Sequence, residues 1–71
     1  MNFKIRAVLG LLDDGEWHFI ERLGEMLQLT ETETEHIIWF LEEFGLVVVD
    51  PFAKRVKMSD DFRRLPELAR I

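Results

Sequence analysis

The feature that most constrains the fold of this chain is a change of hydrophobic period at Gly45. Upstream, apolar residues recur three or four positions apart, as at Ile5, Val8, Leu9 and Leu12, which is the spacing of an amphipathic helix. Downstream come two short apolar or β-branched runs, LVVV and RVKM, joined by DPFAK. Because Asp-Pro favours the opening of a turn, residues 46–58 are predicted to form a two-stranded β-hairpin.

Three helices are predicted before the hairpin. The first covers NFKIRAVLGLL and ends at the turn DDG. The second begins at about His18, after an extended link at Glu16 and Trp17 that can add a third short strand. The third follows the break QLT, where Thr30 or Thr32 can cap it and a glutamate three residues later completes a capping box. Gly45 suits the left-handed residue that ends this helix.

A short fourth helix is predicted in SDDFRRL, where acids precede arginines as the helix dipole favours. A chain of 71 residues is too short for two cores, since a domain of about 60 residues buries only about 60% of the surface that its unfolded form exposes. Residues 1–71 are therefore predicted to form one domain of α+β class, mainly α. The architecture is a three-helix core, a two-stranded hairpin and a short C-terminal helix.

Several classes of protein are disfavoured by composition. The chain has no cysteine, which removes disulfides and thiolate zinc sites and fits the reducing cytoplasm. The longest uncharged apolar runs, such as HIIWFL, are too short to cross a bilayer. His18 and His36 lack metal-binding partners at a known spacing, and no serine elbow or glycine-rich loop is present. We expect a cytoplasmic protein that is not an enzyme, with no metal, cofactor, membrane or small-molecule substrate.

Charge is strongly segregated along the sequence, although the net charge is only −5. Residues 23–53 carry seven acids and no base, a balance of −7, whereas residues 54–71 carry six bases and three acids, a balance of +3. One face or end of the molecule is therefore predicted to be acidic and another basic.

Two sequence patterns at the expected separation resemble the winged helix-turn-helix family. They are LGEMLQLT, residues 23–30, and LEEFGLV, residues 41–47. Gly24 stands where the family uses alanine to let two helices approach closely, and Gln28 replaces the usual turn glycine. The resemblance covers nearly the whole chain. It implies that the third helix lies in the DNA major groove and that the hairpin, the wing, contacts phosphate or the minor groove.

The third helix is an unusual candidate for reading DNA, because it contains no lysine or arginine and most DNA affinity comes from attraction to phosphate. Helical spacing points Thr34, Ile37, Ile38, Leu41 and Phe44 inward. The opposite, acidic and aromatic surface is predicted to bind a protein or a second copy of the chain. Its candidate interface residues are Thr32, His36, Trp39, Phe40 and Glu43.

The two tryptophans are interpreted differently. An indole at Trp39, next to Phe40, would form an exposed apolar patch of the kind that marks an interface. The alternative is that Met1 to Phe3 or the tail PELARI covers it. Trp17, in the link between two helices, is expected to fill the core.

If the chain binds nucleic acid, we expect the basic wing and tail to make the contacts. The candidate phosphate contacts are Lys54, Arg55, Lys57, Arg63 and Arg64, and the alternative is that these bases form a solvated face. Two functions therefore stay open. The residues of the third helix favour a protein-interaction module of regulatory type, and the family resemblance favours a DNA-binding transcriptional regulator.

Overall fold

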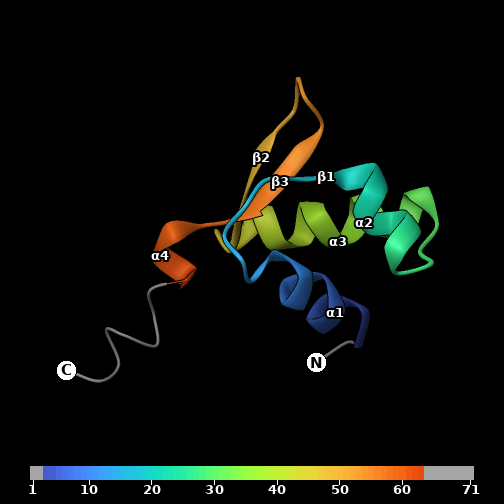
Figure 1. Ribbon diagram of the computed structural model, residues 1–71, viewed down its shortest axis with the longest axis horizontal. Coiled ribbons are helices and arrows are strands. Elements are labelled where there is room, and N and C mark those ends of the chain that lie inside the picture. The colour runs from blue at the N-terminus through green and yellow to red at the C-terminus, as the bar shows by residue number, and fades with distance from the viewer. Residues whose placement is uncertain (1–2, 64–71) are drawn as a thin grey trace.

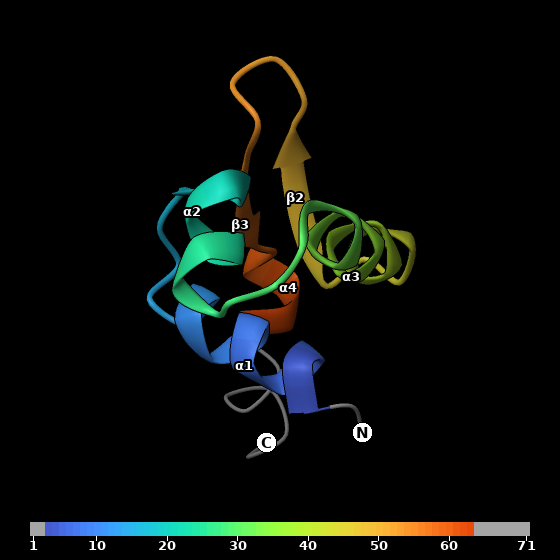
Figure 2. The same ribbon diagram turned by 90° about the vertical axis from the view of Figure 1, so that its right-hand side faces the viewer.

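The computed structural model describes residues 3–63 of the chain. Three helices precede a β-hairpin that projects beyond them (Figure 1), and Figure 2 shows the same hairpin standing clear of α2 and α3. The elements in order are α1 (Phe3–Leu12), β1 (His18–Phe19), α2 (Ile20–Met26), α3 (Glu31–Glu43), β2 (Val47–Asp50), β3 (Arg55–Met58) and α4 (Asp60–Arg63). The predicted α+β class, the hairpin and the fourth helix are confirmed in these residues.

The strands form one antiparallel sheet in the order β1-β3-β2. Val48 pairs with Lys57, and Phe19 pairs with Arg55. Because alternate residues of a strand face opposite sides, these four residues lie on one face of the sheet, which we call the outer face. The inner face carries Val47, Val56 and Met58, all buried.

The core lies between the inner face of the sheet and the three longer helices. Val8 and Leu12 from α1, Leu23 from α2 and Leu41 from α3 are almost completely buried against Val56. Fully burying each such side chain contributes about 1.5–3 kcal/mol relative to leaving it exposed. The helical spacing read from the sequence therefore selects the correct inward side of each helix.

The turn between α2 and α3 is built by local chemistry. Thr30 caps α3: its hydroxyl accepts from the Glu33 amide at 3.1 Å, and the Glu33 carboxylate accepts from the Thr30 amide at 3.1 Å. This is the predicted capping box, with Thr30 rather than Thr32 as the cap. Gln28 adopts a left-handed φ of 56°, which explains why glycine is usual there. A Cβ added at Gly24 would lie 2.7 Å from the Thr34 hydroxyl, so the close approach expected of a small residue is confirmed.

Three sequence expectations differ from the structure. The second helix starts at Ile20 rather than about His18, because His18 and Phe19 pair with β3 as the third strand. Phe44 was predicted to point inward but is 68% exposed, since α3 ends there and Gly45, at φ 72°, turns the chain away. Trp17 is not in the core. It is 37% exposed and lies against Arg55 and Lys57.

Candidate nucleic-acid and protein interfaces

A groove lies between α2, the N-terminal half of α3 and the turn of the hairpin. Its lining includes four glutamates but only two bases, Arg22 and Lys54. This acidic groove repels phosphate, so α3 cannot lead an approach to DNA by charge. The glutamates are Glu21, Glu25, Glu31 and Glu35.

The turn at the end of the hairpin, residues 51–54, is held by Asp50. One carboxylate oxygen of Asp50 accepts from the amides of Phe52 at 3.1 Å and Ala53 at 3.2 Å, and the other accepts from Arg55 Nε at 3.2 Å. The Ala53 amide, with Arg55, keeps the pKa of Asp50 below its usual range. Lys54 takes a left-handed φ of 55°, and its carbonyl accepts from the Ile20 amide at 3.0 Å. The turn is therefore fixed both within itself and to the start of α2.

The outer face of the sheet combines aromatic and basic side chains. The Arg55 guanidinium lies 4.7 Å, and the Lys57 ammonium 5.1 Å, from the centre of a Trp17 ring. Cations over an indole are stabilised by the ring quadrupole. Phe19 is 58% exposed and lies on the same face through its pairing with Arg55. Two of the predicted phosphate contacts are thus held in fixed positions by Trp17.

The predicted phosphate contacts do not form one cluster. Lys54 is in the exposed turn and lines the acidic groove, whereas Arg55 and Lys57 lie on the outer face. Arg63 ends α4, and Arg64 lies outside the described residues. Sequence reasoning missed Arg22, which lines the groove from α2.

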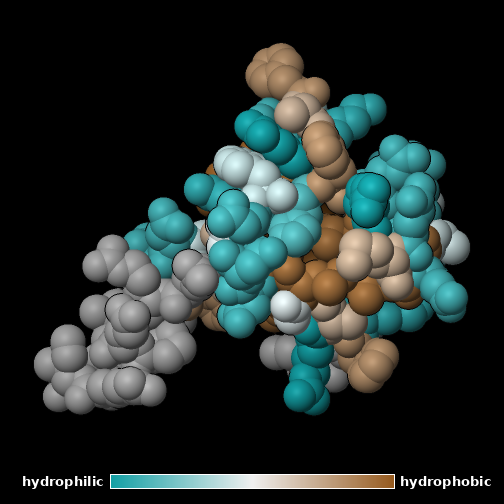
Figure 3. Space-filling view, in the orientation of Figure 1, coloured by the Kyte–Doolittle hydropathy of each residue, from teal (hydrophilic) through white to brown (hydrophobic). Residues whose placement is uncertain are grey.

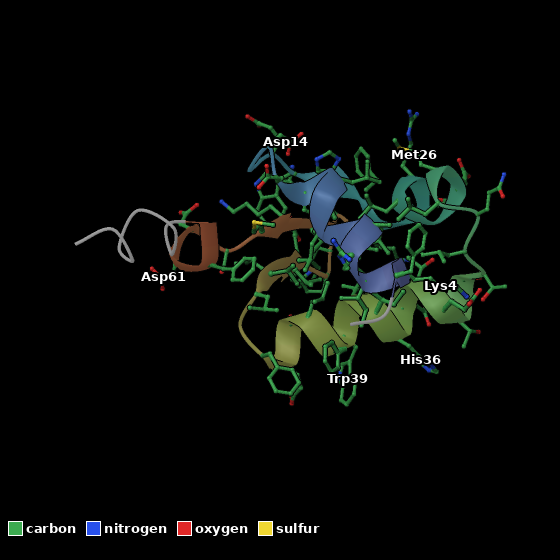
Figure 4. The ribbon with its side chains drawn as sticks, turned by 90° about the horizontal axis from the view of Figure 1, so that it is seen from below. Lys4, Asp14, Met26, His36, Trp39 and Asp61 are labelled. Carbon is green, nitrogen blue, oxygen red and sulfur yellow. The ribbon has the colours of Figure 1, made fainter. Side chains whose placement is uncertain are left out.

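Four of the predicted interface residues, Thr32, His36, Trp39 and Glu43, are exposed along α3, and Phe40 is 42% exposed beside them. Trp39 and His36 project from α3 away from α2 and the strands (Figure 4). Trp39 is 64% exposed, and the Phe40 and Phe44 rings are in contact, with centroids 4.8 Å apart. Within residues 3–63, Phe3 does not cover the indole, since Phe3 itself is 83% exposed. We call Trp39, Phe40 and Phe44 the aromatic flank of α3.

An ion pair joins α1 to the start of α3. The Lys4 ammonium, on α1, donates to the carboxylate of Glu33 in the first turn of α3, and Figure 4 shows Lys4 beside the N-terminal end of α3. The hydrogen bond from Lys4 and the one from the Thr30 amide lower the pKa of Glu33 to about 2. Glu33 is therefore held by contacts within the domain, whereas Glu21, Glu25, Glu31 and Glu35 line the groove.

Two other kinds of site are not found in the described part of the chain. Residues 3–63 contain no group of three or more histidines and carboxylates placed to hold a metal ion. None of their helices combines the length and apolar character needed to cross a membrane.

Comparisons with known proteins agree with this geometry. No family model and no curated protein matches the sequence. Among solved structures, the chain is similar to a MarR family transcriptional regulator from Silicibacter pomeroyi DSS-3, with 28% sequence identity and a TM-score of 0.76. The match covers 96% of this chain and 51% of that regulator, so this chain spans about half its length.

The match supports the family resemblance seen in the two sequence patterns. The matched region includes both the helix-turn-helix, formed by α2 and α3, and the wing, formed by β2 and β3. It also favours the DNA-binding regulator over the protein-interaction module that the α3 residues favoured. The chain is therefore a winged helix-turn-helix domain similar to a MarR family transcriptional regulator.

Proposed function

We propose that this chain is a DNA-binding domain of a transcriptional regulator and that its wing, rather than α3, leads the approach to DNA. The observation that carries the proposal is the similarity to a transcriptional regulator over 96% of the chain. On this proposal residues 1–71 act as one domain in the cytoplasm, by binding rather than catalysis, without a cofactor.

Charge supports a wing-led approach. Residues 51–58 carry three bases and no acid, whereas residues 31–43 carry five acids and no base. A protein gains DNA affinity by releasing counterions from phosphate, and only lysine and arginine do this. Lys54 in the turn and Arg55 and Lys57 on the outer face are the described bases of the wing. Phosphate contacts would therefore concentrate on the hairpin.

The test is duplex binding measured over a series of salt concentrations. Replacing Lys54, Arg55 and Lys57 together by alanine should weaken binding on the order of 100-fold at low salt and reduce the slope of log K against log salt by about 3. The control is Arg6→Ala, which removes an exposed base from α1 and should change the slope little. Equal losses in the two variants, or no duplex binding by the wild type, would refute the proposal.

A second candidate function is association with a protein, most simply a second copy of this chain. The aromatic flank of α3 favours it, because three large aromatic side chains there are between 42% and 68% exposed. Exposed apolar patches of this kind usually mark contact surfaces. The acidic groove and the aromatic flank involve different residues, so one domain can use both.

Sedimentation of the free protein tests this second candidate. The wild type should associate at micromolar concentration, and Trp39→Ala should leave a folded monomer, because the indole contributes a large share of the buried apolar area. Added salt should loosen the association only partly, since screening acts on charges and not on aromatic contact. Phe3→Ala, which removes an exposed ring from α1, is the control. A monomeric wild type with Trp39 already shielded from a fluorescence quencher would contradict association.

A further inference from the structure

The end of the wing carries a side chain whose position has no role in folding. Phe52 is 97% exposed, the highest value among the exposed large apolar residues of the described chain. Figure 3 shows apolar atoms at the outer end of the hairpin, projecting beyond the body of the molecule. A fully exposed phenyl ring loses the 1.5–3 kcal/mol that burial would contribute, so this placement stabilises nothing within residues 3–63.

The ring is held out by a rigid turn. The Phe52 amide itself donates to Asp50, the Ala53 amide donates to the same oxygen, and Pro51 precedes them. Arg55 fixes the second oxygen of Asp50, and the Lys54 carbonyl is tied to Ile20. Such preorganisation lowers the entropy lost when a protruding group enters a site.

The residues around Phe52 indicate what kind of binding partner its ring could enter. Its neighbours in the turn are Pro51, Ala53 and Lys54, and Arg55 and Lys57 follow on β3. The acid before them, Asp50, is bonded to the Phe52 and Ala53 amides and to Arg55. Proteins that kink DNA from the minor groove insert an apolar side chain between two base pairs, while lysine and arginine side chains contact the flanking phosphates. A two-stranded ribbon is wider than the minor groove, which is about 6 Å across, so only the side chain at the tip of the turn would enter it.

We infer that Phe52 is a wedge that inserts between two base pairs from the DNA minor groove, with Lys54 directed at the adjacent phosphates. The inference rests on the proposed function and deepens it, because it names the contact that the wing makes. Flexible pyrimidine-purine steps such as TA unstack most easily. The preferred target is therefore a TA step within A·T-rich duplex.

The experiment uses a short A·T-rich duplex with 2-aminopurine at a central TA step, whose fluorescence rises when the base unstacks. Wild-type protein should raise the fluorescence. Phe52→Ala should abolish the rise and weaken binding about tenfold, with an unchanged salt slope because no charge is lost. Phe52→Leu should keep most of the rise, since leucine also serves as a wedge. Lys54→Ala should lower the slope by about 1 and leave the rise at saturation.

The outcomes separate this inference from the proposed function. Wild-type binding without a fluorescence rise, or an equal rise with Phe52→Ala, overturns the wedge and leaves wing-led DNA binding standing. Absence of any duplex binding at low salt overturns both. Phe3→Ala is the matched control for loss of an exposed ring, and it should bind and unstack as the wild type does. Thermal melting of each variant checks the fold, which should be unchanged because Phe52 is 97% exposed.

Discussion

The third helix and the wing both expose aromatic side chains, but in opposite electrostatic settings. Trp39 on α3 is 64% exposed within a helix of five acids and no base, and Phe52 on the wing is 97% exposed beside three bases. Both lie on elements that proteins of the winged helix-turn-helix fold can present to DNA. The comparison teaches that the fold fixes where recognition elements lie, whereas charge decides which of them can meet phosphate.

The sharpest way to test this contrast is to remove acid from the groove. Glu25→Gln with Glu35→Gln takes two negative charges from the lining of the acidic groove. On the proposed function it should raise duplex affinity on the order of tenfold at low salt, since like charges near phosphate repel. Binding titrations at several salt concentrations measure the gain.

The matched control removes two charges at the C-terminal end of α3. Glu42→Gln with Glu43→Gln alters the net charge by the same amount, but neither residue lines the groove. It should change affinity much less. Equal gains in the two double variants would mean that net charge, and not the groove, limits binding.

The two tryptophans offer a second comparison, this time of stability. Trp17→Ala removes the ring that contacts Arg55 and Lys57, and it should lower the free energy of unfolding by about 1–2 kcal/mol from two cation-π contacts and lost burial. Trp39→Ala should change it by less than about 0.5 kcal/mol, as is usual for exposed positions. Urea unfolding at low protein concentration distinguishes them. A larger loss for Trp39→Ala would show that its ring is covered in the folded monomer.

The smallest effect concerns the ion pair that secures the start of α3. The pKa of Glu33 is lowered from 4.5 to about 2 in the folded protein, so its stabilising contribution is present above about pH 4.5 and is lost as the pH falls from 4.5 toward 2. Denaturant unfolding at a series of pH values should show a loss in this window that is smaller in Glu33→Gln. The wing carboxylate Asp50, also with a lowered pKa, is retained in both proteins. Parallel losses in the two would mean that the pair contributes nothing.

Much of the fold could be predicted from local sequence, for physical reasons that particular residues illustrate. Thr30 and Glu33 specify the start of α3 by satisfying two amides that every helix leaves unpaired, and Gly45 specifies its end. Spacing alone identified Val8, Leu23 and Leu41 as core. The hairpin followed from the period of two and Asp-Pro. The acidic, base-free third helix is likewise a property of the sequence.

The tertiary structure decided what depends on contacts between distant residues. Trp17 was expected in the core, but pairing of β1 with β3 places it beside Arg55 and Lys57. The sequence allowed a short third strand at the Trp17 link, and the strand forms one residue later, at His18–Phe19; its pairing with β3 depends on residues far along the chain. Phe44 fits the inward stripe by angle, yet the helix ends before the stripe reaches the sheet. Spacing gives the direction of a side chain within its own element, and only the packing of other elements decides whether that direction leads to the core or to solvent.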